Sequence, residues 1–156
     1  MRKKRNYRRE IGQDLKYNSN LIGRFINNLM LAGNKSTVEK FIYKALIKVA
    51  KTLNSNDIGL MFEKILNNII ISHELRSRRV GGATYQVPKP LENYRSVSRT
   101  IKFLVKNVRS IKGKTLDEAI ETILLDAYNK TGSIYSAYIN LNNAVEANRV
   151  NAVYRW

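Results

Sequence analysis

Three arginines and a Gly-Gly pair stand close together between residues 76 and 88, and this stretch holds the residue types best suited to binding chemistry. Gly81 and Gly82 readily adopt the positive φ angles of a tight hairpin turn, and the β-favouring residues after them predict a second strand that Pro88 closes. Guanidinium groups match phosphate oxygens, while an aromatic ring and an amide can meet bases. The predicted ribbon is therefore a candidate polyanion site, unless its arginines only protect an exposed sheet edge. Its candidate residues are Arg76, Arg78, Arg79, Tyr85 and Gln86.

The composition of the chain also indicates an anionic partner. Its 156 residues include 28 Lys and Arg against 12 Asp and Glu, which gives a formal charge of +16. Charge of this size destabilises a compact protein by self-repulsion unless an anion neutralises it, so nucleic acid is the expected partner. An apolar fraction of 44% is enough for one domain with its own core, and the absence of cysteine excludes disulfides and thiolate chemistry.

No group of residues predicts catalysis. His73 is the only histidine in the sequence, and nothing pairs it with a nucleophile. Asp117, Glu118 and Glu121 could hold Mg²⁺ in a nuclease, but they fall in the first turns of a predicted helix, where carboxylates offset the helix dipole. The Gly-Gly pair lacks the spacing of a phosphate loop. We therefore expect no enzyme, no cofactor and no metal.

The first 18 residues are predicted to form a flexible basic arm that becomes ordered on a partner, with a plain solubility tail as the alternative. The start of the chain has neither the apolar core of a secretory signal nor the long leader of an imported organellar protein, so the protein is expected to work where it is made. No apolar run approaches the roughly 20 residues that cross a bilayer, and no membrane contact is expected. The basic residues of the arm are Arg2, Lys3, Lys4, Arg5, Arg8 and Arg9.

Apolar residues at helical spacing predict that most of the chain after this arm is α-helical. A first helix is expected over residues 21–30, with Gly33 ending it. Ser36 and Glu39 match a capping box that would begin the second helix. A third helix is expected over 58–69, after an Asn-rich turn.

The second half of the chain begins with the ribbon, expected at about 71–88. Gly113 and Gly132 are expected to end helices, and Thr115 with Glu118 matches a second capping box. The remaining helices are expected over 97–108, from Thr115 toward Gly132, and over 134–145. The whole predicts a mainly α protein: one domain over 19–156, a six-helix bundle with a protruding two-stranded β-hairpin between helices three and four.

Several segments match the motifs of a known family, and they lie in the family's order with nearly its spacing. They are Lys35-Ser-Thr37, Ser77-Arg-Arg-Val-Gly-Gly-Ala-Thr-Tyr-Gln-Val-Pro88, Glu146-Ala-Asn-Arg149 and Tyr154-Arg-Trp156. By these motifs the chain resembles the bacterial-type form of small-subunit ribosomal protein seven, over essentially its whole length from about Leu15.

The resemblance implies a bundle of six helices, with the ribbon between the third and fourth, that is a primary binder of the 3′ major domain of small-subunit ribosomal RNA. It implies nucleation of head assembly, a place near the mRNA exit channel and the tRNA exit site, contact with head proteins and with platform protein eleven, and no homo-oligomer. Carried over by position, the RNA contacts fall on the basic arm and on Lys35, Ser36, Thr37, Arg76, Arg78, Arg79, Arg95, Lys102, Arg109, Arg149 and Arg155.

Two departures from the family pattern stand out. The last helix of the family usually carries a basic cluster, and the usual Pro ahead of the ribbon is missing near Ile71 and Ser72. Such loosening, with a composition rich in residues that have AT-rich codons, favours an organelle-encoded protein of the mitochondrial matrix, with a plastid or a bacterial cytoplasm as alternatives. The residues that replace the basic cluster are Ser136, Ala137, Tyr138 and Asn143.

An architectural DNA-binding protein is the alternative from another class, with the ribbon acting as a minor-groove arm. Such arms commonly carry an apolar wedge at the tip. The tip here is Val80 between an arginine and a glycine. Competition between duplex DNA and structured RNA would separate the two hypotheses.

Overall fold

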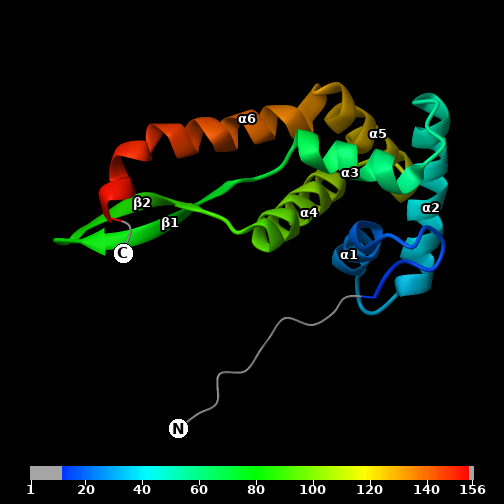
Figure 1. The fold of residues 1–156 in the computed structure, drawn as a ribbon, viewed down its shortest axis with the longest axis horizontal. Helices are drawn as coiled ribbons and strands as arrows, with labels where there is room; N and C mark the ends of the chain where they lie inside the picture. The colour runs from blue at the N-terminus through cyan, green and yellow to red at the C-terminus, as the bar shows by residue number, and fades with distance from the viewer. Residues whose placement is uncertain (1–11, 155–156) are drawn as a thin grey trace, which may run out of the picture.

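The computed structural model of the protein describes residues 12–154, and residues 1–11, 155 and 156 lie outside it. Most of the described chain is helical, and one two-stranded antiparallel sheet separates the third helix from the fourth, as predicted (Figure 1). The elements are α1 (Asn20–Leu29), α2 (Lys35–Thr52), α3 (Ile58–Asn68), β1 (His73–Val80), β2 (Ala83–Pro90), α4 (Asn93–Ser110), α5 (Leu116–Asn129), α6 (Gly132–Ala147) and the 3₁₀ helix η1 (Arg149–Tyr154).

A single hydrophobic core lies between α1, α2, α3, α4 and α5, which together we call the body. The predicted apolar stripes of these helices face inward, and their central side chains are fully buried. Phe25 of α1 packs against Phe62 of α3 with ring centroids 5.5 Å apart. Since each large apolar side chain contributes about 1.5–3 kcal/mol when buried, this core stabilises the body.

The helix starts confirm one predicted capping box and correct the other. At α5, the Thr115 N–H donates to the Glu118 carboxylate at 3.2 Å, and the reciprocal hydroxyl contact completes the box. The box predicted at Ser36 and Glu39 is wrong, because α2 already begins at Lys35 and both residues lie in its first turns. Turn hydrogen bonds within residues 31–35 start that helix early.

Glycine positions differ from the predicted helix ends. Gly33 has a φ of 80° but lies in the loop after α1, which ends at Leu29. Likewise α4 ends at Ser110, ahead of Gly113. Gly132 opens α6 instead of ending α5, since Lys130 already takes the left-handed conformation there. Gly132 has a φ of 73°, a backbone conformation that favours glycine, and a side chain there would also collide with the Asp126 carboxylate.

The ribbon has the predicted two-residue turn. Gly81 and Gly82 have φ angles of 57° and 93°, the signature of the turn that suits twisted hairpins. The second strand runs on to Pro90, paired with His73, and does not stop at Pro88 as predicted. Both strands of a two-stranded sheet are edge strands, so a proline without an N–H costs the ladder little.

The sixth helix leaves the body and runs along the ribbon (Figure 1). Within α6, whose residues are all described, Ile134 near its start is the one buried side chain. The chain then turns into η1, where the Asn151 side chain donates to the backbone carbonyl of Gln86 at 3.1 Å. The ribbon, α6 and η1 therefore form an elongated second part, which we call the extension.

The body begins before residue 19, the boundary that the sequence predicted. Asp14 is buried, and its carboxylate accepts hydrogen bonds from the N–H groups of Lys16 and Tyr17 and from the hydroxyl of Tyr43 on α2. Burial, then the hydrogen bond to Asp14, raises the pKa of the Tyr43 hydroxyl. Residues 14–17 are therefore held against α2, and most of the predicted basic arm lies outside the described residues.

Candidate nucleic-acid interface

Five basic residues form one exposed row along α4, which we call the α4 basic stripe. They are separated by four, three, four and three residues, the spacing of a single helical face. Apolar residues on the opposite face are buried in the body, which forces the row into solvent. The stripe consists of Arg95, Arg99, Lys102, Lys106 and Arg109.

The sequence prediction included Arg95, Lys102 and Arg109 but missed Arg99 and Lys106. Both missed residues complete the same helical period, so the spacing alone was signal enough to find them. Arg109 also has a structural contact, because its guanidinium donates to the Leu29 carbonyl at 2.9 Å. That bond satisfies a carbonyl at the carboxyl end of α1, where cations are favoured.

The ribbon arginines do not share one face. Residues of an antiparallel pair that stand opposite each other lie on the same side of the sheet. Arg78 is opposite Tyr85, and Arg76 is on that same face, whereas Arg79 is on the other face with Gln86. Arg78 and Arg79 are both exposed near the turn. The predicted cluster is therefore split between the two sides of the ribbon.

Arg76 is joined to the α4 basic stripe through the carboxylate of Glu74. Glu74 accepts Arg76 Nε on Oε1 at 2.6 Å and Arg99 Nη2 and Nε on Oε2 at 2.7 and 2.9 Å. The Arg76 hydrogen bond, followed by that from Arg99, lowers the pKa of Glu74. Arg76 of the ribbon and Arg99 of α4 therefore lie on either side of one carboxylate.

The two residues predicted to meet bases are held in internal contacts. Tyr85 stacks on Tyr154 of η1, with ring centroids 5.2 Å apart and planes 32° apart. The Gln86 side chain donates to the hydroxyl of Ser77 across the ribbon at 3.0 Å. The Tyr85 contact joins β2 to η1, and the Gln86 contact joins β2 to β1. Both residues therefore stabilise the extension.

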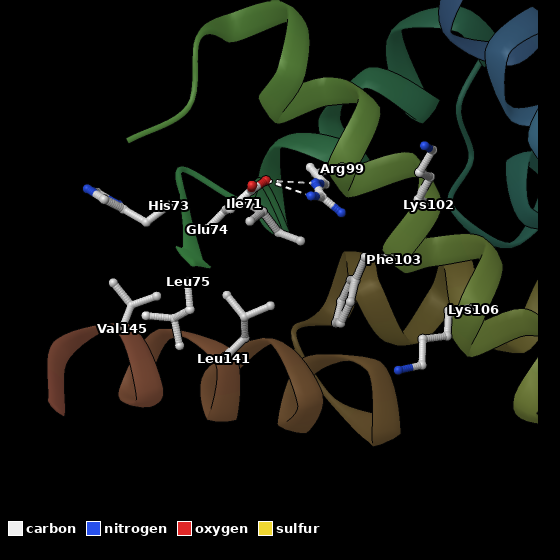
Figure 2. Close-up of a pocket in the computed structure, with 10 residues that line it drawn as sticks. All are labelled: Ile71, His73, Glu74, Leu75, Arg99, Lys102, Phe103, Lys106, Leu141 and Val145. Carbon is white, nitrogen blue, oxygen red and sulfur yellow. Dashed lines mark hydrogen bonds and ion pairs between the residues drawn. The ribbon is translucent and has the colours of Figure 1, made fainter. Parts of the chain in front are cut away.

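A groove of about 380 Å³ opens between the ribbon, α4 and α6. Figure 2 shows apolar side chains from all three elements along it: Leu75 of β1 lies between Val145 and Leu141 of α6, and Phe103 of α4 lies on the other side of Leu141. Three members of the α4 basic stripe line the same groove, namely Arg99, Lys102 and Lys106. It therefore combines an apolar floor with a cationic side.

The remaining predicted residues lie elsewhere. Lys35, Ser36 and Thr37 are exposed at the start of α2, which Figure 1 shows on the side of the molecule away from the ribbon. Lys35 pairs with Glu39 at 3.6 Å. Arg149 of η1 pairs with Glu146 at 3.0 Å. Outside the described residues lie Arg2, Lys3, Lys4, Arg5, Arg8, Arg9 and Arg155.

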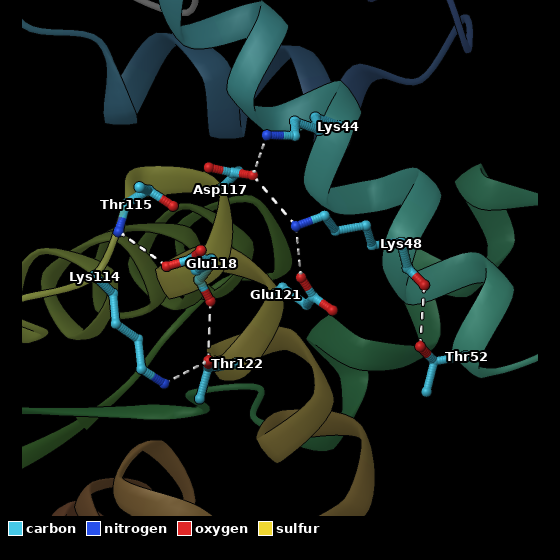
Figure 3. A network of polar contacts seen from close by, with 9 residues as sticks. All are labelled: Lys44, Lys48, Thr52, Lys114, Thr115, Asp117, Glu118, Glu121 and Thr122. Atoms are coloured by element: carbon cyan, nitrogen blue, oxygen red, sulfur yellow. Dashed lines mark hydrogen bonds and ion pairs between the residues drawn. The ribbon is translucent and has the colours of Figure 1, made fainter.

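The carboxylates of α5 have structural partners (Figure 3). Asp117, whose side chain is 3% exposed, pairs with Lys44 of α2 at 2.8 Å and with Lys48 at 3.3 Å. The hydrogen bond from Lys44, followed by that from Thr115, holds the pKa of Asp117 well below its ordinary value. Between residues 12 and 154, no group of three or more His, Cys, Asp and Glu is placed to hold a metal ion. Asp117 and Glu121, which also pairs with Lys48 at 3.3 Å, therefore join α5 to α2, whereas Glu118 caps α5 itself.

An exposed row of cations, continued by a ribbon, is typical of proteins that bind the backbone of folded nucleic acid. Comparison with known proteins makes the assignment more specific. The chain belongs to the family described as Ribosomal protein S7p/S5e, whose sequence model matches residues 1–149. The resemblance seen in the sequence motifs is confirmed.

Relatives named small ribosomal subunit protein uS7 match the chain over nearly its full length. That of Borrelia hermsii is 34% identical over 155 residues, 99% of each chain. That of Borreliella afzelii is 36% identical over the same span, and that of Wolbachia pipientis is 40% identical over 145 residues, 91% of each.

Membership of a family of structural ribosomal proteins confirms the prediction that the chain is not an enzyme. Within the described part of the chain, every helix is too short or too polar to cross a membrane.

Proposed function

We propose that the α4 basic stripe and the ribbon bind the backbone of ribosomal RNA in the small ribosomal subunit, of which the chain is a structural constituent. The observation that carries the proposal is the row of five exposed cations on one face of α4, joined to the ribbon through Glu74. A row of this kind follows a phosphate backbone and reads shape more than sequence.

The first experiment measures binding of the full chain to a transcript of the 3′ major domain of bacterial small-subunit ribosomal RNA at several salt concentrations. If about 8 phosphates are neutralised, log K falls against log salt with a slope of about −6 to −7. Duplex DNA serves as the competitor. A slope near zero, or equal competition by duplex DNA, would contradict the proposal.

A charge reversal near the ribbon turn tests whether that end of the ribbon takes part. Arg78→Glu with Arg79→Glu is expected to reduce the magnitude of the salt slope by about 2, one for each lost phosphate contact. The control Lys51→Glu with Lys64→Glu makes the same change in net charge on α2 and α3. Equal binding by the two double variants would remove the ribbon turn from the interface.

The finer placement follows from the family resemblance and is proposed on that basis. The chain binds the 3′ major domain early and nucleates assembly of the subunit head, near the mRNA exit channel and the tRNA exit site, beside platform protein eleven. Cross-linking within assembled subunits tests each neighbour separately. Cross-links confined to other domains of the RNA would contradict this placement.

A mitochondrial location is also proposed, supported by the AT-biased composition, with plastid and bacterial ribosomes as the other outcomes. Fractionation of the source cells, followed by mass spectrometry of purified small subunits, separates the three.

A further inference from the structure

Glu74 places a negative charge between Arg76 and Arg99 on an otherwise cationic surface. It lies on β1, close to the point where the ribbon leaves the body, and its side chain is only 13% exposed. Simple charge attraction would favour its removal from a surface that binds RNA, because it offsets one positive charge. Its geometry suggests a role other than neutralisation.

Each oxygen of the Glu74 carboxylate holds a different guanidinium. Oε1 accepts from Arg76 Nε at 2.6 Å, which leaves both terminal nitrogens of Arg76 outside this contact. Oε2 accepts from Arg99 at 2.7 and 2.9 Å through one edge of its fork. Both arginine side chains stay accessible, at 42% and 54% exposed. Each guanidinium carries five N–H donors, so donors remain for a ligand.

The backbone just before Glu74 is held against α4. Three residues before Glu74, the N–H of Ile71 donates to the Thr100 hydroxyl at 3.0 Å, and the Ile71 carbonyl accepts from the Ser96 hydroxyl at 2.6 Å. Both hydroxyls are buried on α4. These bonds, which we call the hydroxyl clasp, hold the start of the ribbon against the helix that carries Arg99. Glu74 therefore lies where the ribbon is attached to α4, between the two arginines.

From this geometry we infer that Glu74 is a positioning residue that orders Arg76 and Arg99 as a preformed pair for one backbone phosphate of the RNA. The inference rests on the proposed function and adds Arg99 to the predicted contacts. Two ordered guanidiniums bind a phosphate with less loss of side-chain freedom than two mobile ones. The negative charge of Glu74 weakens the surface field, and the ordering of its two partners outweighs that loss.

The test is the sign of the effect of Glu74→Gln on binding to the 3′ major domain transcript. Positioning predicts weaker binding by about threefold to tenfold, the cost of ordering one or two long side chains. The matched control Glu63→Gln removes one exposed carboxylate from α3, with the same change in net charge. Simple charge attraction predicts that both variants bind slightly more tightly than the unmodified chain.

A double-mutant cycle shows whether Glu74 acts through the two arginines. Arg76→Lys with Arg99→Lys keeps the charge but removes both forks, and Glu74→Gln is expected to cause no further loss of RNA binding in that background. A purely structural role for Glu74 would give the same loss in both backgrounds and would overturn the inference. Thermal unfolding of each variant verifies that the fold is kept.

The result for the unmodified chain separates this inference from the proposed function. If the unmodified chain shows no salt-dependent binding, the proposed function fails and the inference fails with it. If the unmodified chain binds but Glu74→Gln binds as tightly as Glu63→Gln, the inference alone is overturned.

Discussion

Phe62 and Leu141 are both apolar residues at helical spacing, yet the body and the extension use them differently. Phe62 is fully buried against Phe25 in the body. Leu141, on α6, is half-buried and lines an open groove beside the ribbon. The body is stabilised by shared apolar burial, which the helical period encodes directly. The extension is held by edge contacts, aromatic stacking and hydrogen bonds that depend on which elements meet.

The largest expected effect comes from breaking the body. Phe62→Ala is expected to lower the free energy of unfolding by about 3–5 kcal/mol, because it removes buried contacts and leaves a cavity. The matched change Leu141→Ala in the extension is expected to cost about 1 kcal/mol, since less of that side chain leaves water on folding. Urea unfolding measures both values. Equal losses would mean that α6 belongs to the same cooperative core.

The hydroxyl clasp, where body and extension meet, gives the next largest effect. Thr100→Val keeps the side-chain shape but leaves the buried N–H of Ile71 without its acceptor, at a cost of about 1–3 kcal/mol. Amide hydrogen exchange is expected to quicken in the ribbon while the body stays protected. Thr52→Val is the control, because exposed Thr52 makes only the bond to the carbonyl four residues earlier. Unchanged ribbon exchange in Thr100→Val would show that the clasp does not hold the extension.

The smallest effect is confined to acid and concerns the ion pairs between α2 and α5. The lowered pKa of Asp117 means that the folded state binds its proton less readily than the unfolded state. The stability from this group is therefore fully present well above its ordinary pKa of 3.8 and is lost as the pH falls through and below that value. Asp117→Asn should remove this part of the acid dependence.

Urea unfolding of Asp117→Asn and of the unmodified chain from pH 6 down to pH 2 measures the difference. The two curves are expected to converge as the pH falls, because the unmodified chain loses at low pH what the variant lacks throughout. A gap between the curves that stays constant across this range would show that the role of Asp117 does not depend on its charge.

Much of the fold could be predicted from the sequence, for reasons that differ along the chain. The apolar stripes of α1 to α5, the Thr115–Glu118 capping box and the Gly81–Gly82 turn are local sequence patterns. Each of them strongly favours one local structure. The capping box predicted at Ser36 failed because Asn34 and Lys35 already continue the preceding turn into the helix. The strand end predicted at Pro88 failed because an edge strand tolerates proline.

The candidate interface was predicted less completely. Arg99 and Lys106 continue the helical spacing of Arg95, Lys102 and Arg109, so the sequence alone could have predicted them. The pairing of Arg76 and Arg99 through Glu74 was not within reach, because the partners are 23 residues apart and meet only when the ribbon docks on α4. The stacking of Tyr85 on Tyr154 depends in the same way on the return of η1 to β2. The hydrogen bond between Gln86 and Ser77 depends instead on the register of the two ribbon strands.

The sequence by itself determined that this protein is a basic, mainly helical chain with a glycine-turned ribbon and a family signature, because periodicity, turn chemistry and net charge are local or summed properties. Only the tertiary structure decided which cations lie side by side, which are already paired, and that α6 runs along the ribbon. Those facts depend on contacts between residues far apart in the chain, and no local pattern of residues specifies them.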